Sequence, residues 1–134
     1  MSASKKEAYK VENERFLLDM KKKGVKELPG NILYEIVRHS DNLQHPNLNS
    51  IVTVNYIGTL INGYEFDNSY KRGFPEAFRL RDVIDGWQIA LQRMCHGERW
   101  IVYIPYSLGY GKKANGDIPA FSTLVFDIEL LGIM

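Results

Sequence analysis

This 134-residue chain has few side chains that could bind a metal ion or act in covalent catalysis, and their spacing suits neither role. His39, His45 and His96 have no His or Cys partner at metal-ligand spacing, except that His96 follows Cys95 directly, and adjacent side chains diverge. The same divergence argues against a Cys–His dyad, in which the base must face the thiol. No GxSxG, GxGxxG or GxxxxGK[ST] motif occurs. We therefore expect no metal, nucleotide or covalent catalysis.

A second group of candidates is aromatic, because the chain has eight Tyr, six Phe and two Trp. Each aromatic residue taken alone is compatible with an ordinary core. Tyr56, Asp67 and Tyr110 fit that interpretation less well, since a buried tyrosine hydroxyl or carboxylate needs a hydrogen-bonding partner. The glycine-rich, basic segment 109–116 around Tyr110 has no helix after it to direct amides at a phosphate, so we interpret it as a loop.

Strands must position most of these residues, because hydrophobicity alternates with a period of two after Pro29-Gly30. Such alternation is typical of antiparallel strands with one buried face. Asn62-Gly63 predicts a hairpin turn, and residues 39–49 form a polar connection. The predicted strands are NILYEIV (31–37), SIVTVNYIG (50–58), RWIVYIP (99–105) and STLVFDIELL (122–131).

One segment within the strand region has helical spacing. Trp87, Ala90, Leu91 and Met94 recur every three or four residues in VIDGWQIALQRMCHG. Asp85 is placed to cap the start of this short helix, and Gly97 to end it. The order of elements predicts an α+β domain, in which an antiparallel sheet packs its face against one central helix.

Residues 1–28 form a helical extension before the main domain, which we place at residues 29–134. A stripe of mainly apolar residues predicts the helix, and Gly24 is placed to end it. Two interpretations remain open: a docking or dimerising helix, and a terminal helix that covers the main domain or frays from it. The stripe consists of Tyr9, Asn13, Phe16, Leu17 and Met20.

Composition excludes several classes of protein. A net charge of +1 does not favour a nucleic-acid binder, no apolar stretch is long enough to span a membrane, and one cysteine precludes an internal disulfide. The first ten residues lack the apolar run of a secretory signal. As written, the chain is predicted to be cytoplasmic, or periplasmic or in the cell envelope if a leader was removed.

Four motifs in this order resemble the successive signatures of FKBP-type peptidyl-prolyl cis-trans isomerases over residues 50–131: VTVNYIGTLINGYEFDNS, VIDGW, IPYSLGYG and IPAFSTLVFDIELL. The preceding segment ENERFLLDMKKKGVKELPGNILYEIV resembles the lead-in of the bacterial, macrophage-infectivity-potentiator-like branch. The resemblance implies a twisted, five- or six-stranded antiparallel sheet wrapped around one short helix, with an apolar cleft between them. It also implies that the chain is a monomer, or a weak dimer through the N-terminal helix.

The resemblance implies roles for the residues that match these motifs. The expected catalytic residues are Asp67, Tyr110, Tyr56 and, through its backbone N–H, Ile84. The expected substrate-binding residues are Phe66, Val83, Trp87, Ile118, Phe126 and Arg72, with the Trp87 ring as the floor of a proline pocket. At the rim, where well-known eukaryotic members often place an aromatic residue, this chain has Glu76, with Phe74 and Phe78 nearby.

The implied activity is isomerisation of X-Pro bonds in unfolded or flexible chains, without a cofactor. The barrier of about 18–20 kcal/mol is lost amide resonance, so the site must hold the twisted amide more tightly than the planar one. Proline-containing peptides are the expected partners, and macrolides the expected inhibitors. The alternative is a proline-binding or chaperone module with weak or no catalysis.

Overall fold

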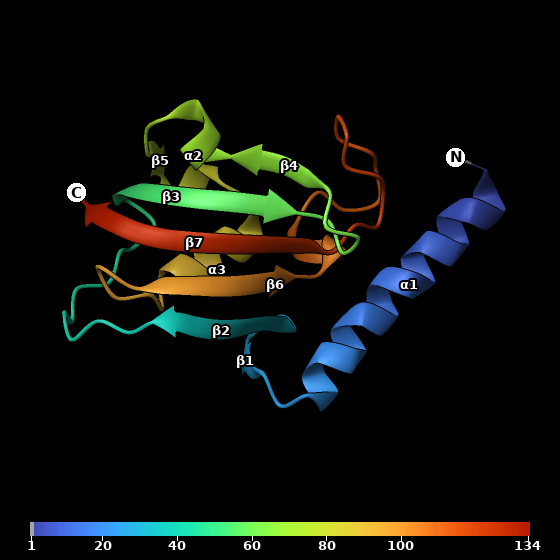
Figure 1. The fold of residues 1–134 in the computed structure, drawn as a ribbon, viewed down its shortest axis with the longest axis horizontal. Coiled ribbons are helices and arrows are strands. Elements are labelled where there is room, and N and C mark those ends of the chain that lie inside the picture. The colour runs from blue at the N-terminus through green and yellow to red at the C-terminus, as the bar shows by residue number, and fades with distance from the viewer. Residues whose placement is uncertain (1) are drawn as a thin grey trace.

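The computed structural model describes residues 2–134, which form a long N-terminal helix and one mixed helix-and-sheet domain, with the helix along one end of the sheet (Figure 1). The helices are α1 (Ala3–Lys22), α2 (Ser69–Arg72) and α3 (Asp85–Leu91), with 3-10 turns at Leu80–Asp82 and Tyr106–Leu108. The strands are β1 (Lys26–Leu28), β2 (Ile32–Arg38), β3 (Ile51–Thr59), β4 (Glu65–Asn68), β5 (Glu76–Arg79), β6 (Arg99–Ile104) and β7 (Leu124–Ile133).

The strands form one antiparallel sheet in the order β1-β2-β6-β7-β3-β4, and β5 pairs with β3 beside β4. The described residues therefore contain seven strands, one or two more than expected. The additional strands are short: β1 has three residues and β5 has four, too few to show alternation. Residues 26–28, assigned from the sequence to the extension, thus belong to the sheet.

The predicted alternation is confirmed in the three central strands. Every second residue is buried along β3, along most of β7 and along β6 as far as Val102, and these side chains face α3, which lies behind the sheet in Figure 1. The hairpin predicted at Asn62-Gly63 joins β3 to β4, and Gly63 has a φ of +88° there. β2 departs from alternation because Ile32 and Leu33 are both buried. Leu33 lies with Leu17 of α1 on the wall of a second groove.

The predicted caps of the short helix are wrong. Ile84 is the N-cap residue and Asp85 is already helical, so its carboxylate lies in the first turn, where it still interacts favourably with the helix dipole. The helix ends at Leu91, well before Gly97. The backbone N–H of Cys95 donates to the buried Glu98 carboxylate at 2.8 Å, so the chain leaves the helical hydrogen-bonding ladder there.

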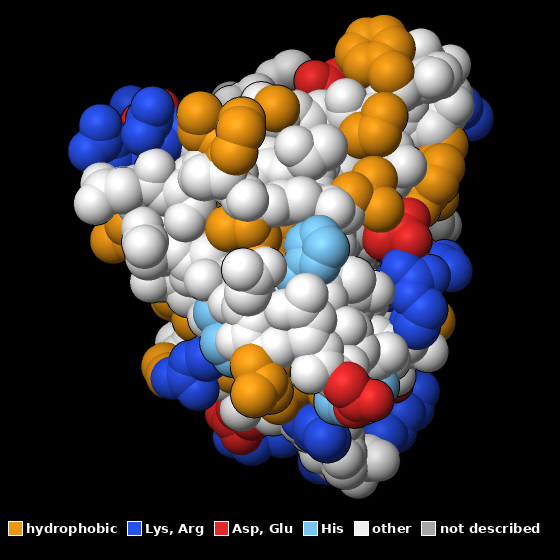
Figure 2. Space-filling view, turned by 90° about the vertical axis from the view of Figure 1, so that its left-hand side faces the viewer, with side chains coloured by type: hydrophobic (Ala, Val, Ile, Leu, Met, Phe, Trp, Pro, Cys, Tyr) orange, Lys and Arg blue, Asp and Glu red, His pale blue; other side chains and the backbone are white. Residues whose placement is uncertain are grey.

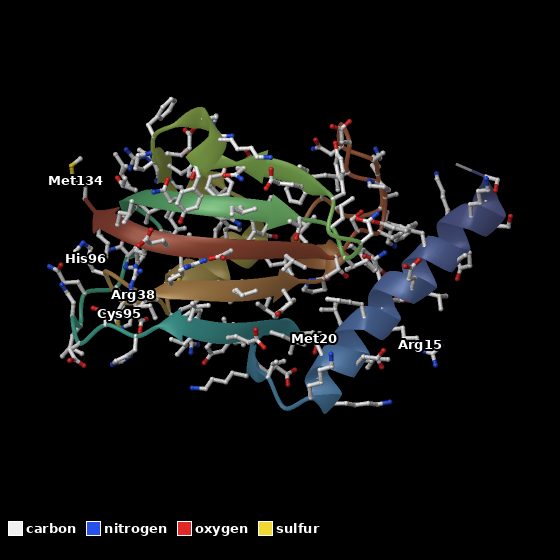
Figure 3. The ribbon with its side chains drawn as sticks, viewed as in Figure 1. Arg15, Met20, Arg38, Cys95, His96 and Met134 are labelled. Carbon is white, nitrogen blue, oxygen red and sulfur yellow. The ribbon has the colours of Figure 1, made fainter. Side chains whose placement is uncertain are left out.

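Helix α1 is attached to the domain through Asn13, which is fully buried. Its Oδ1 accepts from the backbone N–H of Thr123 at 2.7 Å, and its Nδ2 donates to the Tyr9 carbonyl at 2.8 Å. The Tyr9 hydroxyl is also 2.8 Å from Ser122 Oγ. Met20 lies on the side of α1 that faces the sheet, whereas Arg15 projects outward (Figure 3). In this structure α1 covers one end of the domain.

We expect Asn13→Ala to lower the free energy of unfolding by about 1–3 kcal/mol, because it leaves the buried Thr123 N–H without an acceptor. Glu12→Ala, on the exposed side of the same helix, is the control and should change stability by less than about 0.5 kcal/mol. Urea denaturation of both variants measures the difference. Equal stability of Asn13→Ala and the wild type would show that α1 does not depend on this contact.

Candidate active site

A cavity of about 520 Å³ lies between the sheet, α3 and the loop that follows the second 3-10 turn. It collects nine of the ten site residues expected from the sequence; the tenth, Arg72, does not line the cavity but donates hydrogen bonds to Asp67 and Tyr56, which do. The lining residues are Tyr56, Phe66, Asp67, Phe78, Asp82, Val83, Ile84, Trp87, Tyr110, Asn115, Gly116, Asp117, Ile118 and Phe126.

The indole of Trp87 lies at the base of this cavity and is only 4% exposed. The rings of Tyr56, Phe78 and Phe126 contact it edge-on, with centroid distances of 5.0, 5.7 and 5.2 Å. Within residues 2–134 its buried Nε1–H has no acceptor. A planar aromatic surface enclosed by three rings binds little water, so it suits a compact apolar ring such as pyrrolidine.

Polar groups lie on one side of the cavity around Asp67 at the end of β4. The Tyr56 hydroxyl donates to one carboxylate oxygen and the Arg72 guanidinium donates to the other. Arg72 also donates to the Tyr56 hydroxyl at 3.2 Å and to Glu76 at 2.8 Å. These contacts fix the orientation of the Asp67 carboxylate at the cavity wall.

Two opposing effects set the pKa of Asp67. Partial burial acts to raise the pKa, but the hydrogen bonds from Tyr56 and Arg72 and the Arg72 charge outweigh it, so the pKa lies below its ordinary value. Burial and the hydrogen bond to Asp67 raise the pKa of Tyr56. Asp67 is therefore ionised and Tyr56 protonated at neutral pH.

The lowered pKa of Asp67 predicts how its contribution to stability depends on pH. The contribution is fully present above the unfolded-state pKa of about 3.9 and is lost as pH falls through the lower folded-state pKa. We expect the difference in unfolding free energy between the wild type and Asp67→Asn to be constant from about pH 7 to 5 and to shrink below about pH 4. Urea denaturation across this range measures it. A difference that grows toward acid pH would mean a raised pKa.

Two hydrogen-bond donors are free at the cavity. Among residues 2–134, neither the backbone N–H of Ile84 nor the hydroxyl of Tyr110 has an acceptor. Ile84 precedes α3 and its carbonyl accepts from Trp87 and Gln88, so its N–H has a fixed direction. Burial and the charge of Asp67 raise the pKa of Tyr110, which keeps its hydroxyl protonated. Both groups can therefore donate to a bound peptide.

Comparison with known proteins agrees with this geometry. The model of the family described as "FKBP-type peptidyl-prolyl cis-trans isomerase" matches residues 43–131. The chain belongs to this family. The fold expected from the resemblance, an antiparallel sheet with one short helix on its face, is thereby confirmed.

Individual FKBP relatives match beyond the family region. FkpA of Buchnera aphidicola (subsp. Schizaphis graminum) is 44% identical over 98% of this chain and 55% of its own length. The peptidyl-prolyl cis-trans isomerase Mip of Coxiella burnetii is 46% identical over 84% of this chain and 49% of its own. The chain thus spans about half the length of the curated relatives it matches.

Two solved structures resemble at least 95% of the chain, so most of α1 is included. FkpA from Escherichia coli superposes with a TM-score of 0.86 at 41% identity, over 97% of this chain and 63% of that one. A peptidyl-prolyl cis-trans isomerase from Pseudomonas syringae superposes with a TM-score of 0.87 at 40% identity, over 95% and 94%.

Some wall residues of this FKBP cavity were not among the ten expected site residues, and Phe78 was expected only near the rim, beside Glu76. Phe78 of β5 lines the cavity and contacts Trp87, whereas Glu76 accepts from Arg72 outside the lining and Phe74 is 57% exposed. The rim is therefore aromatic through Phe78 and not acidic through Glu76. Asp82 and residues 115–117 also line the cavity without having been predicted. The strand β5 is too short for its period to be read from the sequence.

The histidines and Cys95 lie at the far end of this FKBP domain from α1 (Figures 2 and 3). His45 Nε2 is 3.8 Å from Cys95 Sγ, and His39 Nδ1 is 3.1 Å from Glu98 Oε2. Within residues 2–134 no group of three or more His, Cys, Asp or Glu side chains is arranged to hold a metal ion. Burial and the neighbouring Glu98 raise the pKa of the Cys95 thiol, which opposes thiolate formation.

Proposed function

We propose that this protein catalyses cis-trans isomerisation of X-Pro bonds in flexible or unfolded chains. One observation carries the proposal: a buried indole floor adjoins a fixed carboxylate and two free hydrogen-bond donors in one cavity. The pyrrolidine ring would lie on Trp87, with the bond that rotates beside Asp67. Membership of the FKBP family supports the same activity.

Catalysis in this cavity needs no covalent intermediate. The planar amide is better solvated by water than the twisted one because its charge is more separated, so a water-poor site favours the twisted form. We propose that Ile84 N–H and the Tyr110 hydroxyl hold the carbonyls on either side of the proline, while the Asp67 carboxylate lies beside the twisting carbonyl. A rate factor of about 10⁴ requires about 5.5 kcal/mol, several times the roughly 1 kcal/mol of one hydrogen bond. Binding and desolvation must therefore act together with the donors.

A protease-coupled assay with a cis-proline tetrapeptide, run with and without a macrolide, tests the proposal. We expect acceleration of isomerisation and its suppression by the macrolide, because the inhibitor would occupy the cavity above Trp87. Binding of the peptide without acceleration would instead favour a proline-binding or chaperone module. Self-association through α1 stays a prediction, which sedimentation of the whole chain measures.

Removal of the Tyr110 hydroxyl tests the role of a single donor. We expect Tyr110→Phe to lower kcat/KM about fivefold, since it removes one hydrogen bond of about 1 kcal/mol and keeps the ring. The control is Tyr106→Phe, which alters a tyrosine of the same segment outside the cavity lining and should keep full activity. Equal rates for both variants would exclude the proposed role of Tyr110.

A further inference from the structure

One wall of the cavity is a loop, residues 112–118, here called the rim loop, which has few hydrogen bonds to the rest of the protein and packs only its last residue, Ile118, into the core. Asn115, Gly116, Asp117 and Ile118 from this loop line the cavity. Asn115 and Ile118 exchange backbone hydrogen bonds of 2.9 Å within the loop. Beyond its ends the chain is held by Gly111 N–H to the Tyr106 carbonyl and by Phe121 N–H to the Gly111 carbonyl.

A side chain from another part of the chain holds the tip of the rim loop. The Tyr64 hydroxyl donates to Asp117 Oδ2 at 2.9 Å, across 53 positions of sequence. Among residues 2–134 this is the only hydrogen bond or ion pair between the rim loop and the rest of the protein. The hydrogen bond also raises the pKa of Tyr64, so the hydroxyl remains a donor at neutral pH.

Tyr64 is well placed to act as an anchor because its own backbone is fixed. It lies in the turn between β3 and β4, where its carbonyl accepts from Leu60 N–H at 2.9 Å and its N–H donates to Asn62 Oδ1 at 2.9 Å. Leu60 is buried in the core. Tyr64 therefore links the sheet, through Asp117, to the part of the cavity wall that contains Ile118.

We infer that Tyr64 is a positioning residue of the site: through Asp117 it holds the rim loop closed against a bound proline peptide. The inference rests on the proposed function for its effect on substrate. Tyr64 itself does not line the cavity, and among residues 2–134 its hydrogen bonds go to Asp117, Asn62 and Leu60 and to none of Asp67, Ile84 or Tyr110. Release of the loop should weaken binding and leave the catalytic groups in place, so it should raise KM more than it changes kcat.

Tyr64→Phe removes the hydroxyl and keeps the ring. We expect KM for an X-Pro peptide to rise about two- to fivefold, as for loss of one exposed hydrogen bond, with kcat within about twofold. The matched control is Tyr70→Phe. That tyrosine is 46% exposed against 45% for Tyr64, and its hydroxyl is bonded at 3.4 Å to Glu129, which does not line the cavity. The control should keep both constants.

A double-mutant cycle tests the partner. Asp117→Ala should resemble Tyr64→Phe, the double variant should be no worse than either, and Asp117→Asn, which keeps an acceptor oxygen, should lie nearer the wild type. Additive effects in the double variant, or a loss in kcat alone, would overturn the inference.

Amide hydrogen exchange gives a readout that does not need catalysis. We expect faster exchange across residues 112–118 in Tyr64→Phe than in the wild type and Tyr70→Phe. Unchanged exchange there overturns the inference whatever the activity. If the wild type binds proline peptides without isomerising them, the proposed function has failed. The peptide Kd then replaces KM in the same comparison, and a rise confined to Tyr64→Phe still supports the closed rim loop.

Discussion

Asp67→Ala should lower kcat/KM for an X-Pro peptide by about 10- to 100-fold while the fold persists. The estimate corresponds to about 1.5–3 kcal/mol, the usual contribution of a hydrogen bond to a charged group. The side chain is one-third exposed, so its removal leaves no large void in the core. Arg72 keeps its hydrogen bond to Glu76, which limits the rearrangement. Steady-state kinetics and circular dichroism together measure the effect.

The matched control is Asp127→Ala, which removes an aspartate of similar exposure that is also paired with an arginine. Asp127 accepts two hydrogen bonds from Arg99, at 2.8 and 2.7 Å, and does not line the cavity. It should keep near-normal kcat/KM. A similar fall in both variants would mean that lost ion pairing, and not the carboxylate at the cavity, causes the effect. Near-normal activity of Asp67→Ala would contradict its proposed role.

Gly86→Ala should be among the most destabilising single-methyl changes in the domain. A Cβ atom at this position of α3 would lie 2.5, 2.7 and 2.9 Å from three side-chain carbons of Ile104 on β6. Ile104 is fully buried, so it can move away only by displacing its own neighbours in a closely packed core. We expect a loss of about 1–3 kcal/mol in the free energy of unfolding, together with weaker peptide binding, because Trp87 is the next residue of the helix. Urea denaturation measures the first effect.

Two further variants make this prediction specific. Gly132→Ala, where the new Cβ meets Thr53 at an ordinary 3.5 Å, should change stability much less. Ile104→Ala removes the obstructing atoms, so the double variant should lose less stability than the sum of the two single variants. Strict additivity would show that α3 and β6 do not meet as closely as described.

The sequence predicted the central architecture because its signals are local and repeated. In β3 and β7, seven or more consecutive positions alternate, and the alternation placed Tyr56 and Phe126 on the buried face. Phe78 could not be found in this way because β5 has four residues. The contact between Tyr64 and Asp117 joins two loops 53 residues apart, and no periodicity encodes it. Asp85 has the side chain of a typical N-cap, but the N-cap position is one residue earlier, at Ile84, and Asp85 is the first residue of the helix.

The position of β7 between β6 and β3 has a consequence for synthesis. Until residues 124–133 leave the ribosome, the nascent sheet consists of two separate halves, one of β1, β2 and β6 and one of β3, β4 and β5. Each half has an unpaired strand edge and exposes its part of the hydrophobic core. The chain must then insert its latest strand into the middle, a step that joins partners far apart in sequence and is slow for that reason. We therefore expect the newly made chain to stay incompletely folded until β7 is added, like the unfolded chains on which the protein is proposed to act.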